Sequence, residues 1–370
     1  MLGNQQIEPI SNTALPEGVQ SYKSALLFAM RQALLIRPDT VIFGQGADDH
    51  KGSFGSTTNL AKEFGPNRVM DVPLAEEATT GMAIGAALNG IYPIQLHIRS
   101  DFSLLAMNQI INLAAKYRYM FGGQMEVPMM IRMVIGRSWG QGAQHSQSLQ
   151  SLFAHIPGLT VLMPATPQAI LDCYPYAINE YKNPVISIEH RLLYDLSFQK
   201  IDYPVNSNES PFTSYRLREG KDVTIVATSI MVLEALRAAE FLSKHSSLDC
   251  EVIDLNCVSN PNVPMILESV RKTGKLLIAD TSWKGYGVCA EICRLICEID
   301  PSSLKSPVTT LGMAPVPCPT AKSLEDIFYP NLGVMVDSIA KLITGKDAHG
   351  VSLPDEKSMA DVYKHFKGPF

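Results

Sequence analysis

Two carboxylates and two histidines stand where they could move protons. Glu76 and Glu77 open a helical pattern, and His145 lies in a glycine-rich segment with His155 just before a Pro-Gly turn. A carboxylate in partly apolar surroundings can hold a proton at a pH where an exposed one would not. A histidine beside backbone that glycines leave open can shuttle a proton near neutral pH. Both segments are therefore candidates for acid–base chemistry.

Each of these residues also has a structural interpretation. Acidic side chains such as Glu76 and Glu77 are common in the first turn of a helix, where they interact favourably with its dipole. A single histidine is more often a structural hydrogen-bonding residue, and His155 is the better candidate for anchoring its loop. The residues by themselves leave both interpretations open.

The candidate residues follow predicted strands that alternate with helical patterns. The strands are predicted at residues 40–44, 68–72, 92–98, 127–135, 159–163 and 185–189, and helices at 22–36, 77–88 and 104–119. Such alternation implies a mostly parallel sheet covered on both faces. Ligands bind such sheets outside the carboxyl ends of the strands, so the loops that follow these strands should converge on one rim.

A second alternating segment follows a break in the pattern, and 370 residues exceed what one core usually organises. Its strands are predicted at residues 222–227, 250–255, 275–280 and 308–311, and its helices at 231–243, 264–273, 288–299 and 322–328. The predicted fold class is α/β with two doubly wound domains. The predicted parts are a polar leader (1–20), a first domain (21–196), a linker (197–220), a second domain (221–345) and a tail without assigned fold (346–370). The second domain has few histidines, carboxylates and glycines after its strands, so assembly is its expected task.

The charge and cysteine content exclude several classes. A formal net charge of -5 without long charged runs gives no footprint for nucleic acid or an anionic membrane. There is no apolar run of about 20 residues and no signal-peptide pattern, so we expect the cytosol or an equivalent reducing compartment such as a mitochondrial or plastid matrix. Seven cysteines without a CxxC pair argue against a disulfide framework or zinc site, and we expect buried thiols at Cys289, Cys293 and Cys297.

Three segments resemble one enzyme family. Residues 71–81 read DVPLAEEATTG, residues 112–123 read NLAAKYRYMFGG, and residues 143–159 read AQHSQSLQSLFAHIPGL. In this order and spacing they are similar to the beta subunit of the thiamine-diphosphate-dependent 2-oxoacid dehydrogenase component, of the pyruvate, branched-chain or acetoin type. The resemblance covers about residues 20–343. It implies a transketolase-like pyrimidine-binding domain followed by a transketolase C-terminal-like domain.

The resemblance implies roles for individual residues. Glu76 takes the place of the glutamate that hydrogen-bonds the aminopyrimidine ring of thiamine diphosphate, while Phe102 and Gln45 lie beside the cofactor. His145 would face the reacting carbon and assist acyl transfer. Phe102 could equally be an ordinary core residue. Asn183 lies in a segment that resembles the structural potassium site of several relatives.

The same resemblance exposes departures from the family. Gln45 stands where relatives usually carry an acidic residue, Arg99 where they carry an aromatic or small one, and Arg137 in a loop that is usually rich in glycine. Two added cations near the catalytic rim would favour an anionic substrate, such as one with a second carboxylate or a phosphate. Either arginine could instead point into solvent. Gly81 and Gly85 suggest close packing of their helix against another backbone, which in the family is a subunit contact.

A missing motif points to a partner. Thiamine enzymes hold magnesium and the diphosphate through a Gly-Asp-Gly motif, and this chain has none. The resemblance therefore implies an alpha subunit that carries the magnesium ligands, an alpha2beta2 assembly with the cofactor between chains, and a lipoylated acyltransferase as acceptor. The implied reaction is decarboxylation of a 2-oxo acid with transfer of the acyl unit. The alternatives are a split transketolase-like or acyloin-forming biosynthetic enzyme and a non-catalytic scaffold, and the retained Glu76 and His145 argue against the scaffold.

Overall fold

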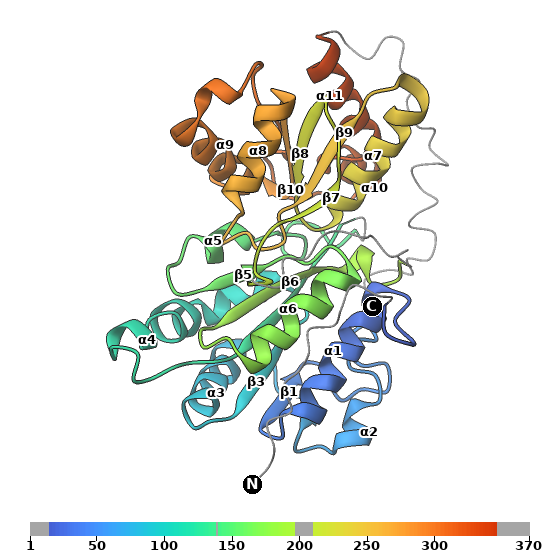
Figure 1. Ribbon diagram of the computed structural model, residues 1–370. Coiled ribbons are helices and arrows are strands. Elements are labelled where there is room, and N and C mark those ends of the chain that lie inside the picture. Colours follow the sequence, from blue (N-terminus) through green and yellow to red (C-terminus); the bar gives the residue numbers. More distant parts are fainter. Residues whose placement is uncertain (1–14, 138–139, 197–209, 346–370) are drawn as a thin grey trace.

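Two α/β units lie one above the other in a computed structural model of the protein (Figure 1), which describes residues 15–137, 140–196 and 210–345. The expected tail, most of the expected leader and more than half of the expected linker lie outside these ranges. Each unit has a sheet with helices on both faces, so the predicted α/β class with two doubly wound domains is confirmed.

The first sheet has six parallel strands. They are β1 (Thr40–Gly44), β2 (Val69–Met70), β3 (Tyr92–His97), β4 (Met130–Ile135), β5 (Thr160–Leu162) and β6 (Val185–His190). Their order across the sheet is β2-β1-β3-β4-β6-β5. The strands β3, β4 and β6 are buried along their whole length, as expected for central strands of a sheet that is covered on both sides.

Helices cover the two faces of this sheet. Helices α1 (Tyr22–Ile36) and α6 (Pro167–Asn179) pack together on one face, and α3 (Glu76–Leu88) lies on the other with α5 (Gln150–Ala154). The short α2 (Leu60–Phe64) precedes β2. A capping box between Ser21 and Ser24 starts α1, where one side chain bonds the backbone N–H of the other in both directions.

The single helix predicted over residues 104–119 is wrong. The chain instead forms a 3-10 helix (η1, Ser100–Ala106), a π-helical stretch (η2, Gln109–Ala114) and a short α4 (Tyr117–Met120). The Ser103 hydroxyl donates to the Ser100 carbonyl oxygen at 2.5 Å, which favours the tighter turn. Further along, the Ala115 N–H bonds the Ile110 carbonyl, one residue beyond the α-helical partner.

The second sheet has the order β11-β10-β8-β9-β7. Its strands are β7 (Tyr215–Arg218), β8 (Val223–Ala227), β9 (Cys250–Asp254), β10 (Leu276–Trp283) and β11 (Thr309–Met313). Helices α7 (Ile230–Ser246) and α11 (Leu332–Thr344) cover one face, α8 (Val263–Thr273) and α9 (Val288–Ile299) cover the other, and α10 (Lys322–Phe328) follows β11 (Figure 1). The strand β7 lies in the stretch expected to be linker, and it is antiparallel to β9 while the other pairs are parallel.

Backbone bonds join the two units. The Met163 N–H donates to the Asn256 carbonyl oxygen at 2.7 Å, and the Val258 N–H donates to the Val161 carbonyl oxygen at 3.0 Å. Both segments directly follow or end a strand of their own sheet, so the junction adds a short antiparallel contact between the sheets. The apolar cores on both faces continue across this junction.

The expectation of three buried thiols on one helix is only partly right. All seven cysteines are free; Cys289 is buried, Cys293 is half-buried and Cys297 is exposed. Because an α-helix turns by 100° per residue, each step of four residues rotates the position by about 40° around the axis. Cys297, the third of these cysteines, therefore lies outside the buried face of the helix. Within the described ranges, no helix is both long and apolar enough to cross a membrane.

Candidate active site

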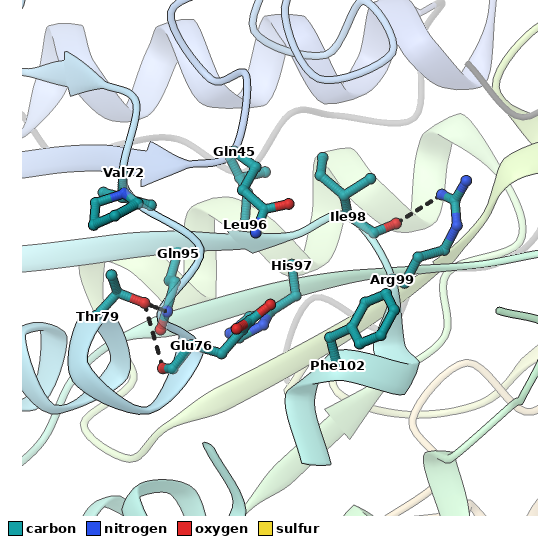
Figure 2. Close-up of a pocket in the computed structure, with 11 residues that line it drawn as sticks. Gln45, Val72, Glu76, Thr79, Gln95, Leu96, His97, Ile98, Arg99 and Phe102 are labelled. Atoms are coloured by element: carbon teal, nitrogen blue, oxygen red, sulfur yellow. Dashed lines mark hydrogen bonds between the residues drawn. The ribbon is translucent and has the colours of Figure 1, made fainter. Parts of the chain in front are cut away.

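A recess opens at the carboxyl edge of the first sheet. The chain leaves β1 for β2 on one side and returns to β3 on the other, so the strand order reverses between β1 and β3, which is where open α/β sheets bind ligands. Figure 2 shows the recess, which is lined by Gln45, Val72, Pro73, Glu76, Thr79, Gln95, Leu96, His97, Ile98, Arg99 and Phe102. Its cavity volume is about 20 Å³, room for little more than one water molecule.

The structure separates the two adjacent carboxylates. Glu76 is the first residue of α3, is half-buried and lines the recess, and no side chain caps this end of the helix. Glu77 is exposed, and its Oε1 accepts a hydrogen bond from Gln109 Nε2 at 3.0 Å. Glu76 is therefore the carboxylate that a ligand in the recess would meet (Figure 2).

Two further predicted cofactor residues join Glu76. Gln45 directly follows β1, where Gly44 passes so close to β3 that a Cβ would lie 2.5 Å from the Leu96 carbonyl oxygen. Only glycine allows this approach, which carries Gln45 to the recess. Phe102 projects from η1 with 37% of its surface exposed, so it is not an ordinary core residue.

The end of β3 contributes polar residues that the sequence analysis did not select. Gln95 Nε2 donates to the hydroxyl oxygens of Thr79 and Thr80 at 3.1 and 3.0 Å. Gln95 Oε1 and His97 Nε2 are buried without a hydrogen-bond partner among the described residues. Burial lowers the pKa of His97 to about 4, so its imidazole is neutral at neutral pH. The signal in the sequence is two polar residues, at 95 and 97, in an otherwise apolar buried strand.

Arg99 points into the protein rather than into solvent. It is 4% exposed and lines the recess. Its Nε donates to Gln141 Oε1 at 3.1 Å, and its guanidinium carbon lies 5.8 Å from the centre of the Phe54 ring. Burial lowers the pKa of Arg99 to about 10, with Asp101 opposing that shift, so the group stays charged at neutral pH.

Arg137 does not line this recess. It is buried, and its guanidinium donates to the Pro330 carbonyl oxygen at 2.5 Å and to Glu234 Oε1 at 3.2 Å. Both partners belong to the second domain, so Arg137 joins the domains and its charge is compensated there. The two arginines expected to act together on an anionic substrate therefore have different positions: Arg99 lines the recess and Arg137 pairs with Glu234.

His145 lies next to the recess through Phe102. Its ring meets the Phe102 ring edge-on, with centroids 5.2 Å apart and planes at 81°. His145 is half-buried, whereas His155 is exposed and precedes β5, at the opposite edge of the sheet. Of the two histidines, only His145 is positioned to reach a ligand beside Glu76.

Asn183 lies apart from the recess. It precedes β6, its Oδ1 accepts from Arg118 Nη1 at 3.3 Å, and its Nδ2 donates to the Tyr181 hydroxyl at 3.4 Å. In the ranges that the structure describes, no group of three or more His, Cys, Asp or Glu side chains could hold a metal ion. A potassium site near Asn183 remains a prediction.

Comparison with known proteins identifies the family. Residues 21–196 match the transketolase pyrimidine-binding domain and residues 213–333 match the transketolase C-terminal domain. The beta subunit of the pyruvate dehydrogenase E1 component from Rickettsia conorii is 34% identical over 321 residues, which cover 86% of this chain and 97% of that protein. The chain belongs to the E1 beta-subunit family. This confirms the family resemblance found in the sequence.

Other relatives of this E1 beta-type chain differ in their named substrate. The beta subunit of acetoin:2,6-dichlorophenolindophenol oxidoreductase from Cupriavidus necator is 35% identical, and the match covers 88% of this chain and 98% of that protein. A solved structure described as a split gene transketolase, inactive beta4 tetramer, has the same fold. Its TM-score is 0.71 at 23% identity, covering 88% of this chain and 98% of that one.

Proposed function

We propose that this chain is the beta subunit of a heteromeric thiamine-diphosphate enzyme that decarboxylates a 2-oxo acid and transfers the acyl unit to a lipoyl carrier. The observation that carries the proposal is the position of Glu76. Its carboxylate lines a recess at the strand-order reversal together with Gln45 and Phe102.

The lining of the recess suits a flat, partly polar ring. Val72, Leu96 and Ile98 supply apolar walls, and Phe102 offers an aromatic surface at the entrance. The unpartnered His97 Nε2 lies within the same lining and could bond a polar ring substituent after a small rearrangement. These residues would hold the aminopyrimidine end of thiamine diphosphate, which when bound supplies a nucleophilic carbon for attack on a 2-oxo acid.

Glu76 and His145 would divide the proton transfers. Glu76 would share a proton between its carboxyl oxygen and a ring nitrogen, because its side chain lines the recess where that ring would lie. His145, beside Phe102, would give or take a proton near the substrate oxygen during acyl transfer. Each group acts only if its own atom reaches the ligand, so the geometry of both segments matters.

The small recess supports a shared site. A volume of about 20 Å³ cannot contain a cofactor, whereas ligand pockets measure roughly 300–1,000 Å³. We infer that an alpha subunit with the Gly-Asp-Gly motif completes the site, holds magnesium and the diphosphate, and forms an alpha2beta2 assembly. The relatives of this chain named above are beta subunits, which supports a partner of the alpha type. The same proposal includes a lipoylated acyltransferase as the acceptor of the acyl unit and a reducing compartment as the location of the complex.

A second candidate follows from Arg99. A buried, charged guanidinium in the lining would suit a substrate or acceptor with an additional carboxylate or phosphate. This favours a split transketolase-like or acyloin-forming enzyme in which an aldehyde or ketone replaces the lipoyl carrier. The scaffold alternative requires a site without function, despite Glu76 and His145 being brought together.

The test is to isolate the tagged chain gently from its own cells and examine it by native mass spectrometry. The proposal expects a heterotetramer that contains thiamine diphosphate and a second chain with Gly-Asp-Gly. Co-purifying lipoylated carrier would favour the dehydrogenase, and turnover with an aldehyde acceptor but without that carrier would favour the second candidate. A cofactor-free assembly of this chain alone, under conditions that preserve known complexes, would overturn both.

A further inference from the structure

The segment that carries His145 (the His145 segment, residues 140–149) is hydrogen-bonded to the start of η1 in the first domain. The Gln147 N–H donates to Asp101 Oδ1 and the Ser100 hydroxyl donates to the Gln147 carbonyl oxygen, both at 3.1 Å. The imidazole of His145 itself makes no hydrogen bond within the described residues; its neighbour is the Phe102 ring. The position of this imidazole therefore depends on where the backbone of the segment is fixed.

The second domain holds the other side of the His145 segment. Near its start, Gly142 passes so close to Thr320 that a Cβ would lie 3.2 Å from the methyl carbon. Near its end, the Ser282 hydroxyl donates to the Ser148 carbonyl oxygen at 2.9 Å. The segment is thus enclosed between the domains, and a shift of either domain would move His145.

A buried side-chain bond closes this contact. Gln150 Nε2 donates to Asp280 Oδ1 at 2.8 Å, and neither residue is exposed. The same oxygen accepts from the Thr228 hydroxyl at 2.5 Å and from the Thr281 N–H at 2.8 Å. Thr228 directly follows β8 and Asp280 lies in β10, so this cluster is built by the second sheet at its carboxyl edge. Buried polar groups with several partners fix a local geometry, because each lost bond leaves an unsatisfied group.

We propose that Gln150 and Asp280 are positioning residues through which the second domain holds His145 in place for acyl transfer. The proposal rests on the proposed function, since it requires that His145 act on the substrate. It gives the second domain a role in the active site in addition to the assembly role expected from the sequence. Neither residue reaches the recess, so both act through the His145 segment.

The test compares Gln150→Ala and Asp280→Ala with a matched control in the complex with the alpha subunit. The control is Gln168→Ala, which removes another Gln–Asp bond, of 2.7 Å within α6 and away from the site. Displacement of a reacting group by about 1 Å costs about 100-fold, so we expect kcat to fall about 100-fold with KM changed less than about 2-fold. Asp280→Asn, which keeps Oδ1 as acceptor, should recover most of kcat, and Gln168→Ala should match the wild type.

A second measurement needs neither cofactor nor partner. In the isolated chain, diethyl pyrocarbonate should modify His145 several-fold faster relative to the exposed His245 in Gln150→Ala and Asp280→Ala, as read by peptide mass spectrometry. Unchanged modification ratios in soluble, folded Gln150→Ala would overturn the positioning role even if Asp280→Ala does not fold. If the wild-type complex turned over no 2-oxo acid, the proposed function would fail while this ratio would still decide whether the second domain positions His145.

Discussion

At the scale of single residues, surroundings rather than residue type decide the chemistry. Glu76 and Glu77 are adjacent and identical, yet one lines the recess and the other is exposed and bonded to Gln109. Arg99 and Arg137 are both buried, yet only Arg99 lies in the lining. Making the same substitution at both members of a pair therefore tests the effect of position, because the side chain that is replaced is the same.

Glu76→Gln should abolish most turnover without unfolding the protein. The amide cannot hold and release the proton that Glu76 would exchange with the cofactor ring, and general acid–base catalysis is worth about 100- to 10,000-fold. We expect at least a 100-fold loss of kcat in the reconstituted complex, with an unchanged thermal midpoint. Glu77→Gln is the control and should keep full activity. Full activity in Glu76→Gln would remove Glu76 from the mechanism.

His97 should make the protein less stable in acid. Its pKa of about 4 in the folded chain lies below the ordinary value of 6.5 because burial disfavours the charged imidazole. The unfolded chain therefore binds the proton first, and stability is lost as pH falls from 6.5 towards 4, by up to about 3 kcal/mol. In His97→Leu, urea denaturation at pH 7 and pH 4.5 should show a smaller drop than in the wild type. An equal drop would contradict this role for His97.

At the scale of elements, one buried ion pair ties adjacent strands of the first sheet. Arg132 on β4 contacts Glu189 on β6 through two bonds of 2.6 and 2.8 Å, and both side chains are at most 1% exposed. The hydroxyl of Tyr174 on α6 donates to the same carboxylate at 2.7 Å. The cluster thus joins two strands and a covering helix beneath the rim that carries the site.

Glu189→Gln should destabilise the fold strongly. It leaves the Arg132 charge buried without its counter-ion, and breaking such a pair costs about 3–5 kcal/mol. The control is Glu63→Gln, whose partner Arg31 is 46% exposed, and surface pairs contribute only about 0–1 kcal/mol. Urea titrations of the isolated chain would give the free energy of unfolding of both variants for comparison. A loss no larger than in the control would show that the buried pair is dispensable.

At the scale of the whole molecule, two apolar cores each continue from one domain into the other, and helix α3 keeps part of its surface uncovered. Beyond its own turn of α3, Gly85 has no described atom within 4 Å of a Cβ position, so the close packing expected there does not occur inside the described chain. Met82, one turn away on the same helix, is 68% exposed. Exposed apolar surface beside an unfilled glycine position suits a subunit contact at α3.

Asp254, at the junction between the domains, should change the stability of the protein with pH in the direction opposite to that expected for His97. Asp254 is buried at the end of β9, and burial raises its pKa to about 7 although the Asn256 N–H, which donates to its carboxylate, opposes the shift. The folded chain then binds the proton more tightly than the unfolded chain, so stability is lost as pH rises from about 4 through 7. Asp254→Asn should lose less stability than the wild type between pH 5 and pH 8, measured by urea denaturation. An unchanged pH slope would exclude Asp254 as its source.

The sequence by itself determined the order and kind of most elements and the segments that carry the site. The predicted bounds of α1, β1, α9 and α10 agree with the structure. Apolar periodicity, capping residues and turn residues are signals that neighbouring residues carry, so they can be read before the chain folds. The family resemblance added Glu76, Gln45, Phe102 and His145 as candidates, and three of these line one recess while His145 packs against it.

Only the tertiary structure decided which candidates meet. It separated Glu76 from Glu77, turned Arg137 towards Glu234 in the second domain, and brought the buried His97 into the lining. It also paired β7 with β9 and Gln150 with Asp280, which are far apart in the chain. These outcomes depend on contacts between distant residues, whose free energy appears only once strands pair and the domains close on each other. No local pattern in the sequence records that free energy.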